Sequence, residues 1–332
     1  MTVSNGGAPA AASGPAGAPS GSGAMRIAIV GAGGVGGFFG ALLARGGANV
    51  TFVARGAHLA AMRRDGLRVE GGAHPVHIQD VRATDDPAEV GATDLVMLCV
   101  KLWGVEEALE QIRPLVGPDT TVVSFQNGVL KDGYLMAAFG AERVIGGVGY
   151  VATHIARPGV IAQTGSLQRL VFGEFDGRTS ARVAAFHEAC AAGGINAEVS
   201  TDIRREIWQK FVFLTGLSAT TATTRLPIGP VRENPQTRAF LLDLMREVVM
   251  VGRASGVALP EDYAGECLKL VDEVAYDMTS SLFHDLDRGR PLEVRWLSGG
   301  VAELGRKAGV ATPLNRAVAD ILALHADGRA EG

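Results

Sequence analysis

The chain has 332 residues, which is long for one ordinary domain and comfortable for two. Hydrophobic residues make up 47% of it and charged residues 20%, the composition of a globular protein with sizeable cores. The formal net charge of −4 provides no basic surface for nucleic acid or anionic lipid, so we expect neither partner. A small anionic ligand would have to be bound by individual cationic side chains.

Residues 1–24 consist almost entirely of Ala, Gly, Pro and Ser and lack the apolar segment of a signal peptide. Such a composition buries too little surface to fold, so we expect a disordered low-complexity tail, with Met25 a candidate for the native start. No segment approaches the ~20 apolar residues that span a bilayer. The 3 cysteines and 7 histidines show no metal-ligand spacing. We therefore expect a cytoplasmic protein without a metal.

From Met25 to residue 200, short β-branched runs alternate with helical patterns such as 178–192. This alternation predicts right-handed crossovers and a parallel sheet in a domain of residues 25–200. The later strands at 160–163 and 169–172 are expected to form an antiparallel edge. The strands that we predict are 26–30, 49–53, 94–100, 121–124, 160–163, 169–172 and 197–200.

After Asp202 the pattern becomes helical, and prolines fall near the breaks between periodic segments. This change predicts a second, all-helical domain of residues 201–328 that contributes the substrate site. The predicted helices are 202–224, 235–254, 261–278, 292–308 and a last one from Pro313.

A glycine-rich turn follows the first predicted strand and opens a helix that runs to about Ala44. Three glycines would serve a tight turn, close approach of the backbone to a pyrophosphate, and close packing of helix on sheet. The helix N-terminus then offers free N–H groups to the phosphates. The context predicts a Rossmann-type α/β dinucleotide-binding domain followed by an all-α domain. The residues expected to contact the cofactor here are Gly31, Ala32, Gly33, Gly34, Val35 and Gly36.

Arg55 follows the second predicted strand, where an enzyme that uses NAD usually carries an acidic residue. A guanidinium at this point suits the 2′-phosphate of NADPH through its charge and its planar fork of donors. A solvated surface arginine is the alternative. We therefore predict NADPH as the cofactor.

Two further strands end in polar residues at the edge where open α/β sheets collect ligands. Lys101 follows one of these strands and Asn127 the other, so we expect Lys101 to contact the cofactor and Asn127 to contact the cofactor or the substrate. The alternatives are a solvated lysine for Lys101 and an ordinary Asn-Gly turn for Asn127.

Lys210 interrupts a nearly continuous apolar stretch in the first helix of the second domain. Hydride transfer to a carbonyl requires an acid near the oxygen, and a desolvated lysine has a pKa low enough for that task. The pattern alone is equally compatible with a lysine that extends to solvent. The histidines His154, His187 and His284 occupy no comparable setting.

These motifs together resemble the ketopantoate reductase (2-dehydropantoate 2-reductase) family, from Met25 to about His325. No single motif is specific, but their combination is. The shared motifs are Gly31-x-Gly33-x-x-Gly36, Arg55, Val100-Lys101-x-Trp103, Gln126-Asn127-Gly128, Ile207-Trp208-x-Lys210, Thr221-Ala222, Pro227-x-Gly229, Ser280-Ser281-Leu282 and Glu293.

The resemblance implies roles for individual residues. The glycine turn and Arg55 would hold NADPH, and Asn127 would lie between nicotinamide and substrate. Lys210 would donate the proton to the keto oxygen. Ser281 would touch the substrate, and Glu293 would border the nicotinamide–substrate junction. A helix N-cap is the alternative for Ser281, and a first-turn helix charge is the alternative for Glu293.

One departure from the family pattern concerns the substrate. The family places asparagines four and eight positions after the lysine, where this chain has Leu214 and Ser218. Leu214 cannot form a hydrogen bond, whereas Ser218 stays a candidate substrate contact with a shorter side chain. A site that lacks polar partners discriminates differently among substrates, because unpaired polar groups are costly to bury.

The resemblance implies that the chain reduces 2-dehydropantoate to pantoate with NADPH, a step toward pantothenate and coenzyme A. The departure keeps open the reduction of another 2-oxo acid or related carbonyl compound. A non-catalytic NADPH-sensing protein is the alternative from a different class. Apolar stretches in the helical half are compatible with a homodimer.

Overall fold

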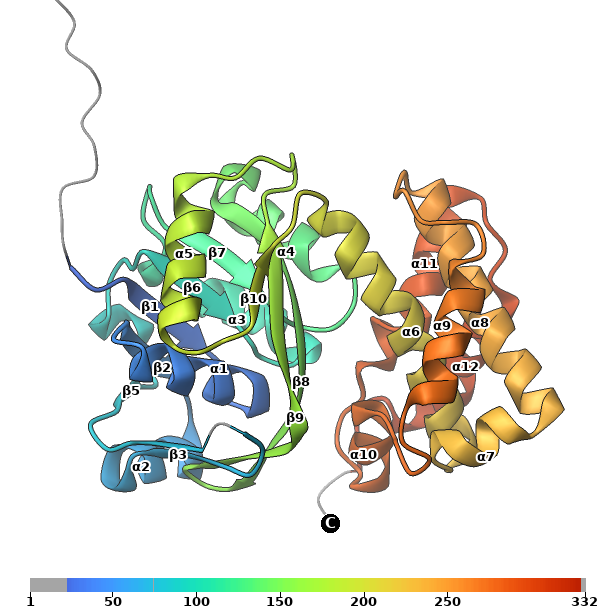
Figure 1. Cartoon of the computed structure of the whole chain (residues 1–332), viewed down its shortest axis with the longest axis horizontal. Helices are drawn as coiled ribbons and strands as arrows, with labels where there is room; N and C mark the ends of the chain where they lie inside the picture. The colour runs from blue at the N-terminus through green and yellow to red at the C-terminus, as the bar shows by residue number, and fades with distance from the viewer. Residues whose placement is uncertain (1–22, 74, 330–332) are drawn as a thin grey trace, which may run out of the picture.

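The computed structural model describes residues 23–73 and 75–329, and nearly all of the predicted tail, residues 1–22, lies outside the described residues. A sheet-containing part is followed along the chain by a helical part (Figure 1). This arrangement confirms the predicted fold class. No helix in the described ranges combines the length and the apolarity that a membrane span requires.

The described strands form one ten-stranded mixed sheet with the order β4-β3-β9-β8-β7-β6-β1-β2-β5 and with β10 paired to β9. Neighbouring strands from β5 to β8 along this order are parallel. The strands are β1 (Arg26–Val30), β2 (Asn49–Val53), β3 (Leu67–Glu70), β4 (Val76–Ile78), β5 (Arg82–Thr84), β6 (Leu95–Leu98), β7 (Thr121–Ser124), β8 (Val144–Arg157), β9 (Val160–Gly173) and β10 (Ala197–Val199).

Both faces of the parallel region are covered by helices, which explains why its strands are apolar without alternation. Ile27 and Ile29 of β1 pack into the core beneath α1 (Gly34–Arg45) and α5 (Ala181–Ala192). Ala28 and Val30 face the opposite core, which contains residues of α3 and α4. The remaining helices of this part are α2 (Gly56–Asp65), α3 (Val105–Gln111) and α4 (Lys131–Phe139).

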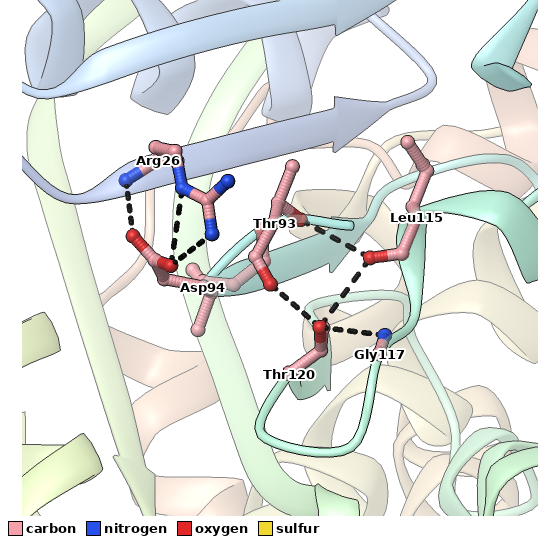
Figure 2. Close-up of polar contacts among 7 residues, drawn as sticks. Arg26, Thr93, Asp94, Leu115, Gly117 and Thr120 are labelled. Carbon is pink, nitrogen blue, oxygen red and sulfur yellow. Dashed lines mark hydrogen bonds and ion pairs between the residues drawn. The ribbon is translucent and has the colours of Figure 1, made fainter. Parts of the chain in front are cut away.

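The amino-terminal ends of the central strands are tied together by polar contacts, shown in Figure 2. The Arg26 amide donates to the Asp94 carboxylate at 2.8 Å, so β1 is joined to the start of β6. The Thr120 hydroxyl donates to the Thr93 carbonyl at 2.5 Å, and the Gly117 amide donates to that hydroxyl at 2.9 Å. These contacts fix the edge of the sheet that lies opposite the glycine turn.

The prediction of two short edge strands near residues 160–172 was wrong. The structure has one long strand, β9, which pairs antiparallel with β8 and lies within the sheet. The register shifts between the pairs Thr153–Gln163 and Val151–Gln168, so the turn-like residues 164–167 form a bulge and not a turn. We did not predict β8 because its glycines weaken the strand pattern.

The helical part is built around α6, which extends from the sheet into the helical core (Figure 1). Ile203 and Ile207 of α6 pack against Val148 of β8. Glycine allows this approach, because a Cβ on Gly146 would lie 2.7 Å from the Ile203 side chain. The helices are α6 (Ile203–Thr224), α7 (Ile228–Glu233), α8 (Pro235–Ala254), α9 (Tyr263–Glu273), α10 (Ser281–Asp287), α11 (Ser298–Ala308) and α12 (Pro313–Leu322).

Two predicted helices are shorter than expected, and α7 and α10 were not predicted. The helix expected over 261–278 ends at Glu273 because the Tyr276 and Met278 carbonyls accept hydrogen bonds from the first amides of α7. The helix expected over 292–308 is divided into a short 3₁₀ turn at Glu293–Arg295 and α11. At the first of these places tertiary hydrogen bonds replace the continuous helix that periodicity favours.

Candidate active site

Three glycines of the turn between β1 and α1 meet three different requirements. Gly31 has a φ of +91°, and a Cβ there would lie 2.8 Å from the Val100 amide nitrogen. A Cβ on Gly36 would overlap the Gly31 carbonyl and lie 3.0 Å from the Cys99 Cβ, so only glycine allows α1 to pack this closely on the sheet. Gly33 has no protein atom within 4 Å of its Cβ position, which leaves its backbone accessible to a ligand.

The other residues of the turn support this arrangement. The Ala32 carbonyl is 2.9 Å from Nε2 of His58, and a Cβ on Gly34 would lie 2.5 Å from the Thr153 carbonyl. Val35 is partly buried against the sheet core. The first turn of α1 carries no acidic residue and no side-chain cap, so its amide groups can receive an anion.

Arg55 lies directly after β2, where the sequence predicts the 2′-phosphate contact. Its guanidinium forms an exposed ion pair with Glu107 at 2.9 Å and a short hydrogen bond with Gln111. Both partners belong to α3, so the arginine is held at the carboxyl edge of the sheet. A phosphate that binds here would have to compete with the Glu107 carboxylate.

Lys101 connects the sheet to the helical part. Its ammonium lies 2.8 Å from Asp285 and 3.3 Å from Glu293, and the Leu102 amide donates to Glu293 at 3.0 Å. Burial alone would lower the pKa of Lys101, but the two carboxylates outweigh this effect and raise it. Lys101 and Glu293 are therefore brought together, and Asp285 is a partner that sequence reasoning missed.

Asn127 lies in the loop after β7, and its neighbour Gln126 holds that loop in place. The Gln126 side chain donates to the Val100 carbonyl at 2.6 Å and accepts from the Ser124 hydroxyl at 2.8 Å. The Asn127 side chain is left to face α6. Its amide oxygen accepts a hydrogen bond from Lys210 at 3.0 Å.

Lys210 projects from α6 toward the sheet and not into bulk solvent. Its ammonium donates to Asn127 and, at 2.5 Å, to the Gly149 carbonyl of β8. It also lies 5.4 Å from the centre of the Tyr150 ring. Burial and the positive charge of Lys131 lower the pKa of Lys210 to about 8, although Glu293 acts in the opposite direction. These contacts place the Lys210 ammonium away from bulk solvent, and its role as a proton donor stays a prediction.

This pKa predicts the pH dependence of any reaction in which Lys210 supplies a proton. The lysine holds its proton below about pH 8 and loses it above, so kcat/KM should fall about tenfold per pH unit in the alkaline range. Tyr150, whose pKa burial raises to about 12, does not titrate there. Initial rates from pH 6 to 10 test this, and a kcat/KM that stays constant up to pH 10 would contradict it.

Lys210 and Asn127 line a narrow pocket between the loop after β7 and α6. The pocket holds about 10 Å³, roughly the space of one water molecule. Its apolar wall comes from Ile207, Phe211 and Leu214 of α6. A 2-oxo acid is larger than one water molecule, so the pocket as it stands is too small to hold such a ligand.

Neither of the two serines predicted to contact substrate lines this pocket. Ser218 is on α6, two turns after Lys210, and its buried hydroxyl has no hydrogen-bond partner among the described residues. Ser281 is exposed at the start of α10. The N-cap of α10 is Ser280, whose hydroxyl accepts from the Phe283 amide and lies 2.9 Å from the Thr221 hydroxyl.

Lys131 and Asp132 of α4 form a buried ion pair beside the same pocket, and sequence reasoning missed it. The signal that could have identified Lys131 is its position four residues after Asn127, beyond the carboxyl end of a strand. Among the described residues, no group of three or more His, Cys, Asp or Glu side chains could hold a metal ion.

A glycine turn at the carboxyl edge of a parallel sheet, together with a helical part whose lysine bonds the loop after β7, is typical of a nicotinamide-dinucleotide oxidoreductase. Family models then specify the class further. The model described as "Ketopantoate reductase PanE/ApbA" matches residues 27–177, and its C-terminal counterpart matches residues 202–326. The chain belongs to the ketopantoate reductase family and is an oxidoreductase.

Individual relatives agree with this assignment. The 2-dehydropantoate 2-reductase of Mesorhizobium japonicum is 35% identical over 316 residues, covering 89% of this chain and 95% of that protein. The 2-dehydropantoate 2-reductase structure from Geobacter metallireducens has a TM-score of 0.85 at 29% identity, covering 90% of this chain and 99% of that one. A D-mandelate dehydrogenase structure with NADH and anilino(oxo)acetate shares the fold, with a TM-score of 0.82 at 21% identity, covering 91% and 98%.

Proposed function

We propose that the chain reduces 2-dehydropantoate to pantoate with NADPH, with Lys210 as the proton donor. The observation that carries this proposal is the Lys210 ammonium, bonded to Asn127 and Gly149 and held at a pKa of about 8. A non-catalytic NADPH sensor has no need of such a group. A cytoplasmic location, a step toward coenzyme A and the domain division at residues 200 and 201 belong to the same proposal.

The residues present fit a dinucleotide. The open backbone at Gly33 and the uncapped first turn of α1 would receive the pyrophosphate, and Arg55 would receive the 2′-phosphate. Bound there, the cofactor supplies a hydride to the keto carbon. Glu293, which accepts from the Leu102 amide, would keep that strand end in place beside the nicotinamide.

The chain's own residues handle the proton. Lys210 releases one proton to the keto oxygen as negative charge develops there. Asn127 and Gly149 accept hydrogen bonds from the ammonium and thereby aim it. Ile207, Phe211 and Leu214 keep bulk water away from the reacting groups.

A second candidate substrate is another 2-oxo acid or a related carbonyl compound. Leu214 lines the pocket where the family pattern has an asparagine, and it offers no hydrogen bond to a substrate hydroxyl. The hydroxyls of Thr215 and Ser218 on the same helix are buried without a partner among the described residues. Neither hydroxyl lines the pocket, although Ser218 occupies the position of the family's second asparagine.

Steady-state kinetics with NADPH separates these candidates. We expect the highest kcat/KM for 2-dehydropantoate among branched, unbranched and aromatic 2-oxo acids. A kcat/KM at least tenfold higher for another acid would transfer the proposal to that substrate. Consumption of NADPH with none of them, despite tight cofactor binding, would favour the sensor.

The cofactor preference depends on whether the Arg55 guanidinium pairs with Glu107 or with the 2′-phosphate of the cofactor. We expect Arg55→Gln to weaken NADPH binding about 10- to 100-fold, the loss of one or two charge-assisted hydrogen bonds, and to leave NADH binding unchanged. Glu107→Gln removes the competing carboxylate and should strengthen NADPH binding. Fluorescence titration with both cofactors measures these effects. Equal weakening of NADH and NADPH by Arg55→Gln would refute a 2′-phosphate contact.

A further inference from the structure

Lys131 is a buried cation for which the mechanism above provides no role. It lies in the first turn of α4, four residues after Asn127, and its side chain is only 1% exposed. Its ammonium donates to the adjacent Asp132 carboxylate at 2.8 Å. Burial raises the pKa of Asp132, and the charge of Lys131 opposes that rise.

The Lys131 ammonium has unused hydrogen-bonding capacity. An ammonium carries three N–H donors, and Asp132 is the only partner of Lys131 among the described residues. A charge removed from water is costly unless it is paired and its donors are satisfied. The remaining donors are therefore available to a further acceptor, and the positive charge suits an anionic one.

The position of Lys131 indicates what that partner is. Lys131, Lys210 and Asn127 line the same pocket, and the Asn127 amide oxygen accepts a hydrogen bond from Lys210. Their charges interact, because Lys131 contributes to the lowered pKa of Lys210. The opposite wall is Ile207, Phe211 and Leu214, which offers no polar group to an anion.

We propose that Lys131 binds the substrate carboxylate while Lys210 serves the neighbouring keto oxygen. This inference rests on the proposed function and specifies how the site selects 2-oxo acids over neutral ketones. A 2-oxo acid carries its carboxylate on the carbon next to the keto carbon, so its two recognition groups must lie close together. Two lysines that line one narrow pocket meet this requirement.

The test compares a 2-oxo acid with its neutral methyl ester in a matched set of variants. Lys131→Met removes the charge and keeps the length of the side chain. The double variant Lys131→Met/Asp132→Asn avoids a buried unpaired carboxylate, and Asp132→Asn alone removes the pair but keeps the cation. Lys307→Met, which removes an exposed lysine paired with Glu303, controls for a general loss of charge.

We expect both variants that lack Lys131 to raise KM for 2-dehydropantoate about 10- to 100-fold, as expected for losing a charge-assisted hydrogen bond. The kcat/KM for the methyl ester should change less than about threefold. The preference for acid over ester should therefore largely disappear. Asp132→Asn and Lys307→Met should retain the wild-type preference.

The proposal would fail if kcat/KM fell equally for acid and ester in the variants that lack Lys131. It would also fail if Asp132→Asn lowered kcat/KM for the acid as much as Lys131→Met does. Either result would mean that the ion pair only supports α4. If no form reduces the ester, the dissociation constant of pantoate with NADP⁺ present, measured by calorimetry, decides. It should rise about 10- to 100-fold without Lys131. A wild-type protein that reduces no 2-oxo acid would refute the proposed function itself, which distinguishes the two failures.

Discussion

Replacing Lys210 with alanine is expected to lower kcat about 100- to 10,000-fold, the contribution of a positioned general acid. In the proposed mechanism the Lys210 ammonium is the proton source, and the nearby Asn127 amide cannot replace it. The dissociation constant of NADPH should change little, because the glycine turn and Arg55 lie on other elements. Steady-state kinetics with a fluorescence titration of NADPH measures both quantities.

Lys307→Ala provides the matched control for this variant. Lys307 is exposed and forms a helical ion pair with Glu303, so its loss should leave kcat and NADPH binding unchanged. Near-normal turnover in Lys210→Ala would remove Lys210 from the mechanism. Loss of NADPH binding together with turnover would instead indicate that the variant disturbs the fold.

Alanine substitutions at Gly33 and Gly36 are expected to separate cofactor binding from folding. A Cβ at Gly33 meets no protein atom within 4 Å but occupies the space where a pyrophosphate would approach. Gly33→Ala should therefore weaken NADPH binding about 10- to 100-fold and barely change the thermal midpoint. Gly36→Ala forces a Cβ against the Gly31 carbonyl, so it should destabilise the protein by about 1–3 kcal/mol and weaken binding as well.

Gly133→Ala is the control for both glycine substitutions. Gly133 is an exposed residue of α4 with no atom within 4 Å of its Cβ position, and alanine favours helices. Thermal melts with and without NADPH distinguish the variants. If Gly33→Ala bound NADPH normally, the dinucleotide would have to lie elsewhere.

Local patterns were sufficient to predict the elements that position the site. The turn at Gly31 follows a continuous apolar strand, and Lys210 interrupts an otherwise apolar helix face. Such signals depend on neighbours along the chain, and the structure has β1, α1 and α6 where they were expected. The strand ends at Lys101 and Asn127 were also identified because parallel strands bring their carboxyl ends to one edge.

Contacts between distant residues could not be predicted in the same way. Asp285 and Glu293 meet Lys101 only because α10 and the turn after it pack against the sheet part. β8 was missed because glycine is unfavourable in a strand unless a neighbouring element packs close to it, here Ile203 of α6. The N-cap of α10 is Ser280 and not Ser281. The sequence alone does not show which of two adjacent serines caps a helix.

The contact of Lys101 with two carboxylates has a consequence for the environment in which the protein works. Lys101 is 40% exposed, whereas the side chains of Asp285 and Glu293 are 10% and 7% exposed. Dissolved anions reach the Lys101 ammonium more readily than dissolved cations reach the two carboxylates. Added salt therefore weakens the ion pairs of Lys101 with Asp285 and Glu293 by screening the lysine. The strength of this link between the sheet part and the helical part is thereby tied to the ionic strength around them.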